Sequence, residues 1–271
     1  MKTLKYILPL FILILACEEP IEVDLNTENP RLVIDASINW KKGTSGNQQS
    51  IKLTLTSPYF SNVISPANNA VVSITDQNSN TFSFIEEGTS GIYSCDNFNC
   101  SIGSTYYLTI LYQDEIYTAQ ETFTAVSSFD FIEQFEGAGF SGEDYEIKAY
   151  FTDPENETNF YFFEFESDAL SIPELGVYED RFTNGNQMFG YFSDEEVTEG
   201  NNLIIRNYGI SENFYNYMFV LLQQNNSESG GPFETQPATV RGNCINKTNS
   251  TNYPLGFFRL SEVDEAVYTI E

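Results

Sequence analysis

Short runs in which apolar and polar residues alternate follow one another from Arg31 to Phe123, and this pattern restricts the possible folds more than any other feature. Ile51, Leu53 and Leu55 give the clearest case, because a polar residue separates each from the next. A period of two puts the apolar side chains on one face of a β-strand, whereas a helix needs a period near 3.6. The first half of the chain is therefore predicted to be built from strands.

Turn-forming residues such as Pro58 and Asp114 separate these runs. Seven strands are predicted in this way: Leu32–Ile38, Ile51–Thr56, Val71–Thr75, Thr81–Ile85, Gly91–Ser94, Thr105–Tyr112 and Glu115–Phe123. Seven short strands in about 95 residues are typical of an immunoglobulin-like sandwich of two sheets. We therefore predict such a β-sandwich over residues 30–125.

Residues 126–271 have a different character and are predicted to form a second β-rich domain. A pair of strands is expected at Glu146–Thr152 and Asn159–Glu166. Residues 167–202 are acidic, irregular and interrupted by glycine, so long loops are expected there.

One helix is predicted in this second domain, near residues 211–224. Ser211 is suited to cap its first turn, and Ile210 and Tyr215 can make a hydrophobic contact across that cap. One helical face is shared by Phe214, Met218, Leu221 and Leu222. The predicted fold class is therefore mainly β, with an immunoglobulin-like sandwich followed by a β-rich domain that carries one helix.

The N-terminus reads as a short export signal. Its start is basic, and the apolar run from Tyr6 to Leu15 is about half as long as a membrane-spanning helix. The tetrad Ile14-Leu15-Ala16-Cys17 resembles the bacterial lipobox, in which the cysteine is diacylated and becomes the new N-terminus after cleavage. Residues 1–16 are thus predicted to be a lipoprotein signal peptide, and Cys17 the site of lipid attachment. The alternative is an ordinary secretory signal with a chance cysteine.

Glu18 and Glu19 resemble the acidic surface-export signal of lipoproteins in the Bacteroidota. Residues 17–29 would then be a lipidated tether. Each buried methylene of an acyl chain contributes about 0.8 kcal/mol, so two or more chains hold a protein at a bilayer without a spanning helix. The predicted location is the outer membrane, with the protein lipid-anchored and facing the cell exterior.

The chain is strongly acidic and contains no histidine. Its 39 Asp and Glu outnumber 12 Lys and Arg, and removal of residues 1–16 changes the net charge from −27 to −29. Nucleic acid and anionic lipid would repel such a chain. The lack of histidine excludes Ser-His-Asp and Cys-His catalysis and the usual zinc sites. No nucleophile motif or glycine-rich phosphate loop is present. We predict no catalytic residue, metal site or cofactor, and expect a binding protein rather than an enzyme.

Three cysteines follow the lipobox. Cys95 and Cys100 lie between two strand-like runs, so they could form a disulfide at the tip of a hairpin in an oxidising compartment. A reduced, inert pair and half of a metal site are the alternatives, and a C-x4-C spacing without histidine disfavours the metal. Cys244 is expected to be a buried small hydrophobic residue, although a bridge to one member of the pair stays open.

Two further features could carry binding. Asp153, Glu155 and Glu157 alternate in a turn and could offer oxygens to calcium. The segment lacks the glycine and the closing acid of a calcium loop, so an ordinary turn started by Asp-Pro is the favoured interpretation. Exposed aromatic residues are expected around Phe140 and in a loop at Phe189–Phe192, where they could contact a glycan or a protein partner.

Several short motifs follow the lipobox in a fixed order. They are Pro30–Asp35, Gly103, Tyr106–Thr109, Thr152–Glu155, Asn159–Tyr161, Tyr215–Gln224, Pro237–Asn243 and Pro254–Phe258. Together they span nearly the whole mature chain and resemble the domain-of-unknown-function family 4249. This is a family of Bacteroidota lipoproteins commonly encoded beside TonB-dependent outer-membrane receptors. The pair Cys95 and Cys100 is not part of the family pattern.

The resemblance implies two β-rich domains and an accessory role beside a receptor rather than a reaction. The expected partners are a TonB-dependent receptor barrel and, through the acyl chains, the outer membrane, with no nucleic acid. One alternative is a stand-alone glycan-binding or adhesive surface lipoprotein. The other is a subunit of an outer-membrane assembly or secretion complex.

Overall fold

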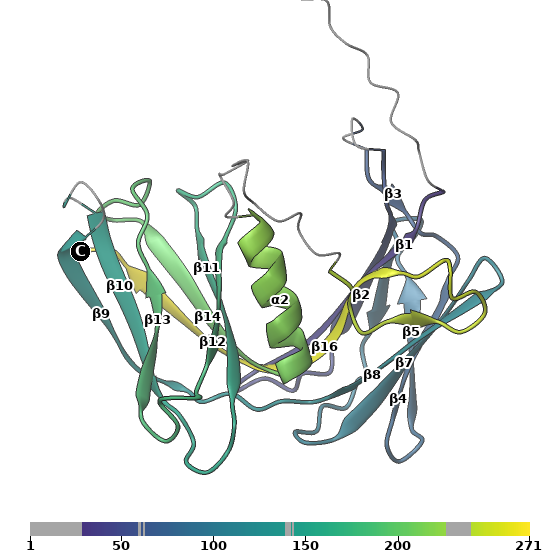
Figure 1. Ribbon diagram of the computed structural model, residues 1–271, viewed down its shortest axis with the longest axis horizontal. Coiled ribbons are helices and arrows are strands. Elements are labelled where there is room, and N and C mark those ends of the chain that lie inside the picture. Colours follow the sequence, from purple (N-terminus) through teal and green to yellow (C-terminus); the bar gives the residue numbers. More distant parts are fainter. Residues whose placement is uncertain (1–28, 59–60, 62, 139–141, 143, 226–239) are drawn as a thin grey trace, which may run out of the picture.

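The computed structural model describes residues 29–58, 61, 63–138, 142, 144–225 and 240–271, and within them the chain is mainly β with one helix. Two β-rich bodies lie side by side in Figure 1, and the long strand β16 (Leu255–Thr269, yellow) runs from one into the other. The predicted mainly β class is confirmed.

The first body contains all seven predicted strands and one short addition. In chain order these are β1 (Leu32–Lys41), β2 (Gln49–Leu55), β3 (Ser65–Pro66), β4 (Val71–Asp76), β5 (Thr81–Glu86), β6 (Ile92–Cys95), β7 (Thr105–Tyr112) and β8 (Glu115–Thr122). One layer holds β1, β2 and β6, and the other holds β4, β7 and β8. Strand β5 pairs with both β4 and β6 and so joins the layers.

The core of the first body lies between these layers. Ile34 and Ile51 reach it from one layer and Leu108 and Ile110 from the other, and all four are buried. The apolar side chains of the period-two pattern lie on one face, as predicted, since every second residue of these strands points inward. The other face of each layer is turned outward.

The second body is also layered. A three-stranded sheet of β9 (Phe129–Ala138), β10 (Asp144–Thr152) and β13 (Gln187–Phe192) has the order β13-β10-β9. It faces β11 (Phe160–Ser167), β12 (Glu174–Glu179) and β14 (Asn202–Ile210), which belong to the main sheet. Phe151, Phe163 and Phe165 fill the core between them. Gly190 lets β13 lie close to β11, because a Cβ added at this position would be 2.2 Å from the Phe163 ring.

Two expectations for this body are wrong. Strands β10 and β11 exist as predicted but do not pair with each other, because each lies in a different sheet and they meet face to face through Phe151 and Tyr161. Residues 167–202, expected as long loops, contain β12 and β13. Each of these strands contains a glycine, which weakens the local strand signal, whereas pairing with β11 and β10 holds them extended.

The predicted helix is confirmed as α2 (Glu212–Asn225). The Ser211 hydroxyl accepts the Phe214 N–H at 3.3 Å, as an N-cap does. Phe214 and Met218 pack with Tyr208 and Phe257 in a third apolar cluster, on the face of the main sheet opposite to the second core. The helix therefore covers the junction between the two bodies (Figure 1).

Strand β16 serves both bodies, so strand pairing crosses the predicted division between residues 125 and 126. Residues 255–263 run parallel to β1, and residues 263–269 pair antiparallel with β14. Phe258 belongs to the first core and Tyr268 packs against the second. Gly256 allows β16 to pair closely with β1, because its φ is +89° and a Cβ there would lie 2.0 Å from the Ile34 carbonyl oxygen. β15 (Ile245–Asn246) also pairs with the first body, along β8.

Candidate functional site

The outward face of the three-stranded sheet carries a row of aromatic rings across its middle. Tyr150 on β10 lies directly opposite Phe131 on β9 and Phe189 on β13. The ring centroids of Phe131 and Tyr150 are 4.6 Å apart and stacked, and those of Tyr150 and Phe189 are 5.4 Å apart. Phe135 and Tyr191 extend the same face, each 40% exposed. We call Phe131, Phe135, Tyr150, Phe189 and Tyr191 the aromatic face.

Lys148 lies in the centre of this face. Its Nζ is 4.8 Å from the Phe135 ring centroid and 5.3 Å from that of Phe189, so the ammonium contacts both rings. It also donates to the Glu146 carboxylate, and this bond raises the lysine pKa. The ammonium therefore stays charged at neutral pH among the exposed rings.

The aromatic face is suited to binding rather than to a reaction. An outward sheet face is normally polar, and exposed aromatic clusters mark interaction surfaces. The stacked rings of Phe131 and Tyr150 offer apolar surface to the side chains of a partner.

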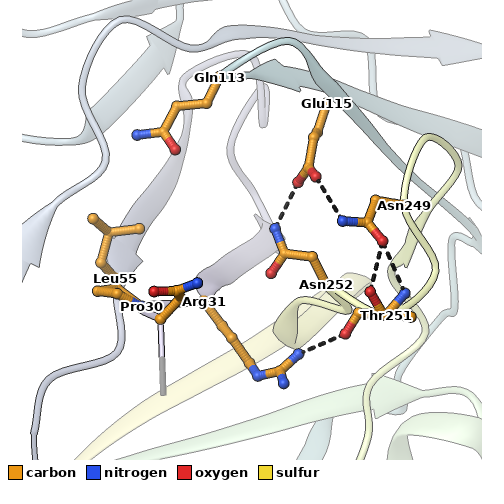
Figure 2. Close-up of a pocket in the computed structure, with 9 residues that line it drawn as sticks. Pro30, Arg31, Leu55, Gln113, Glu115, Asn249, Thr251 and Asn252 are labelled. Atoms are coloured by element: carbon orange, nitrogen blue, oxygen red, sulfur yellow. Dashed lines mark hydrogen bonds between the residues drawn. The ribbon is translucent and has the colours of Figure 1, made fainter. Parts of the chain in front are cut away.

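A polar pocket of about 930 Å³ lies where residue 29 leads into the first body (Figure 2). Its lining comes from the start of β1, the end of β2, the β7–β8 turn and the loop before β16. The lining residues are Asn29, Pro30, Arg31, Leu55, Gln113, Glu115, Asn249, Thr251 and Asn252.

Glu115 organises one wall of this pocket. Its carboxylate accepts hydrogen bonds from the Tyr117 hydroxyl at 2.7 Å and from the side-chain amides of Asn246, Asn249 and Asn252 at 2.9, 3.2 and 2.6 Å. The Tyr117 bond, followed by the asparagine bonds, holds the pKa of Glu115 below its usual value. With four donors already bound, Glu115 fixes the 246–252 loop and is poorly placed to act as a base.

Two guanidinium groups hold the next part of this loop. Arg31 and Arg241 lie 4.0 and 3.9 Å from the ring centroid of Tyr253, and the Arg31 side chain donates to the Thr251 carbonyl at 3.0 Å. Tyr253 is thus contacted by both cations. These contacts tie the start of β1 to the residues that precede β16.

The predicted attachment and export residues, Cys17, Glu18 and Glu19, lie outside the described residues. The acidic turn lies within them. Asp153 is buried and accepts hydrogen bonds from the Tyr161 hydroxyl and from the Gly185 N–H, whereas Glu155 and Glu157 are exposed. In the described part of the chain no three acidic or cysteine side chains gather as metal ligands would.

The three later cysteines are free. The hairpin expected at Cys95 and Cys100 is wrong, because β6 and β7 belong to different layers and the segment between them crosses the sandwich. Phe98 fills the core on the way, Cys95 contacts Asn97, and the Cys100 thiol donates to the Gly46 carbonyl at 3.3 Å. Burial raises the pKa of Cys100 to about 12, which disfavours its reactive thiolate form.

Cys244 is buried in the first core, as expected of a small hydrophobic residue. Burial raises its pKa to about 12 as well. No helix in the described ranges is both long and apolar enough to cross a membrane.

Sequence reasoning found part of the aromatic face and missed the rest. The segment 189–192 was expected to be an exposed loop, but it is strand β13, with Phe189 and Tyr191 outward and Phe192 buried. Phe140 lies outside the described residues. The alternation of aromatic and acidic residues over 129–136 was the available signal for Phe131 and Phe135, but alternation does not say which face stays uncovered.

Arg259 is the other residue that sequence reasoning missed. It is 5% exposed, lies beneath α2 on β16, and donates to the Ser261 hydroxyl at 2.8 Å. Its guanidinium is 4.6 Å from the ring centroid of Tyr208 and 5.1 Å from that of Phe214, and burial lowers its pKa. These contacts place a cation inside the third cluster and help fix α2 across the junction.

Comparisons with solved structures give low overall similarity. A segment of two fibronectin type-III domains from chicken tenascin matches with 10% identity and a TM-score of 0.22, covering 67% of this chain and 91% of that one. A protein of the DUF4785 family from Legionella pneumophila matches with 9% identity and a TM-score of 0.24, covering 66% and 52%. The search of curated protein sequences gave no match.

A family model gives the decisive comparison. The model described as "Domain of unknown function (DUF4249)" matches residues 18–266, which is nearly the whole chain that follows Cys17. The motifs quoted from the sequence lie within that range. This protein therefore belongs to the DUF4249 family.

Proposed function

We propose that this protein is a surface-exposed, lipid-anchored outer-membrane lipoprotein that acts by binding, as an accessory subunit of a TonB-dependent transporter. The lipobox ending at Cys17 supports the anchor, and Glu18 and Glu19 support the outward location. The chemistry of the described residues favours binding over catalysis, because their pocket carboxylate is held by four donors and their buried thiols have raised pKa values.

The observation that carries the proposal is the aromatic face. Its rings lie on the second body, whereas the chain from Cys17 enters the first. A protein tethered through its first body can thus present the second to a neighbour in the same membrane. In this mechanism the acyl chains hold the protein at the bilayer, residues 17–29 give it reach, and the C-terminal half contacts the extracellular mouth of the barrel.

Affinity purification from native outer membranes tests the proposal. We expect the wild-type protein to recover a TonB-dependent receptor, and the double variant Phe131→Ser/Phe189→Ser to recover at least about tenfold less, as loss of central aromatic anchors does. Phe182→Ser is the matched control, because Phe182 is 91% exposed and lies outside the aromatic face. Recovery of the wild type without any such receptor would overturn the proposal.

The anchor has its own test. Cys17→Ala should leave the protein folded, as judged by circular dichroism, while moving it from the membrane fraction to the soluble fraction. Unchanged membrane recovery of that variant would contradict lipid attachment.

A glycan-binding or adhesive surface lipoprotein is the second candidate, and the same exposed rings favour it. It predicts that the soluble protein binds polysaccharide arrays and that Phe189→Ser removes the signal. Recovery of assembly or secretion subunits in the purification would instead point to the third expected role, in an outer-membrane complex of that kind.

A further inference from the structure

Large aliphatic side chains gather, exposed, at one end of the first body. Their exposed fractions run from 42% for Leu111 to 70% for Val63 and Ile85. The set, which we call the aliphatic end, comprises Val63, Ile64, Val71, Ile85, Leu111 and Ile116. Single exposed apolar residues are ordinary on a protein surface, but a group at one end is a feature of an interaction surface.

Strand register shows that four of these residues form a row. Val71 on β4 lies opposite Leu111 on β7, and Leu111 lies opposite Ile116 on β8. Ile85 is at the same level, because it follows Phe84, whose partner is the residue after Val71. Outward-pointing neighbours on adjacent strands are close enough to make one continuous surface.

Val63 and Ile64 join the same end through β3. They directly precede β3, which pairs with the end of β2 at Thr54 and Leu55. Leu55 lines the polar pocket together with Arg31 and Gln113, and Gln113 lies in the turn just after Leu111. The aliphatic end therefore lies beside the place where the chain from Cys17 enters the fold.

The length of that chain limits how far this end can be from the acyl groups. Twelve residue steps separate Cys17 from Asn29, and even a fully extended chain of that length reaches only about 40 Å. On the second body, the exposed Ile172 lines a pocket together with Leu222, which is near the C-terminal end of α2. Figure 1 shows that end of α2 on the same side of the molecule as the start of β1.

We propose that the aliphatic end rests on the bilayer surface, with its side chains in the interfacial region of neutral phospholipids. The proposal relies on the lipid anchor of the proposed function and adds an orientation to it. Neutral headgroups are favoured because the chain without residues 1–16 has a net charge of −29 and is repelled by anionic ones. The anchor keeps the local lipid concentration high, so a small apolar contact suffices to orient the domain.

Depth-dependent quenching tests this orientation. The lipidated protein is reconstituted in phosphatidylcholine vesicles that contain spin-labelled lipid, with a fluorophore at Ile64→Cys or, as the matched control, at Phe182→Cys. Phe182 follows β12, whose last residue pairs with the first residue of β11, at the end of the second body away from Ile172. We expect the label at position 64 to be quenched at least about threefold more strongly than the label at position 182. Protein without either substitution gives the background from Cys100, the half-buried thiol.

Equal quenching at the two positions would overturn the inference. Flotation of the same vesicles with wild-type and Cys17→Ala protein separates the two ideas. If wild type floats and Cys17→Ala does not, but positions 64 and 182 are quenched equally, the lipid anchor holds and the proposed orientation is rejected. If both proteins float equally, the anchor and the orientation are both rejected. Shielding of position 64 that requires an added receptor would assign the aliphatic end to a protein partner and also overturn the bilayer contact.

Discussion

The outward faces of the two bodies differ sharply, although both belong to sheets built from alternating residues. On the first body, Ser73, Thr109 and Thr118 lie side by side in the middle of the outward face of β4, β7 and β8. At one end of that face the Thr105 and Thr122 hydroxyls are 3.2 Å apart. On the second body, the matching position holds the aromatic face. The comparison teaches that the same local pattern can give a solvated face or a binding face, depending on the outward residues alone.

The inner faces are alike, and disrupting one should have the largest effect. Phe163 is fully buried and contacts Phe129, Phe151 and Phe165. Phe163→Ala should lower the free energy of unfolding by about 3–5 kcal/mol, because a large cavity remains. Urea denaturation measures this, and Phe182→Ala should change it by less than about 0.5 kcal/mol. A small effect of Phe163→Ala would mean that the second core is loosely packed.

The shared strand should make the two bodies depend on each other. Gly256→Ala places a Cβ against the Ile34 carbonyl at a positive φ, and we expect a loss of about 3 kcal/mol in the free energy of unfolding. Gly200→Ala is the control, since Gly200 also has a positive φ (+91°) but no atom within 4 Å of the added Cβ, and it should cost about 1–2 kcal/mol. Equal losses in the two variants would show that β16 adapts beside β1.

Glu115, in the wall of the polar pocket, should make the stability of the first body depend on pH. The pKa of Glu115 is lower in the folded protein than in the unfolded chain. The ionised carboxylate therefore stabilises the fold above the unfolded pKa, and this stabilisation is lost as pH falls through the folded pKa. Glu115→Gln should cost about 1 kcal/mol at pH 7, a value reduced for solvent screening. Denaturation at pH 7 and at pH 3 should show the difference from wild type shrinking at the lower pH. A constant difference would contradict the ionised role.

The outward faces should give the smallest effects on stability and the clearest contrast in binding. Phe131→Ser/Phe189→Ser removes stacked rings, and a loss of only about 1–2 kcal/mol is expected. Thr109→Ala, on the outward face of β7, should change stability by less than about 0.5 kcal/mol and leave partner recovery unchanged. A loss above about 3 kcal/mol in the double variant would show that the aromatic face is part of the core.

Much of the fold was predictable because its signals are local. The strands of the first body and the Ser211-capped helix follow from residue period and capping, which act over a few neighbours. The change of layer between β6 and β7 and the placement of β10 and β11 in different sheets were not predictable, since strands adjacent in sequence can lie in different layers. Strands β12 and β13 were missed because their partners, β11 and β10, supply the order that their own residues signal weakly.

The sequence by itself determined the mainly β class, the position of the helix and the acidic, histidine-free chemistry. The tertiary structure decided that residues 255–263 return to β1 and that β16 joins the two bodies. It also decided that the rings around Tyr150 stay uncovered and that Val71, Leu111 and Ile116, which are distant in sequence, lie side by side on adjacent strands. Alternation records that a strand has two unlike faces, whereas long-range pairing selects which strands meet and which face remains outside.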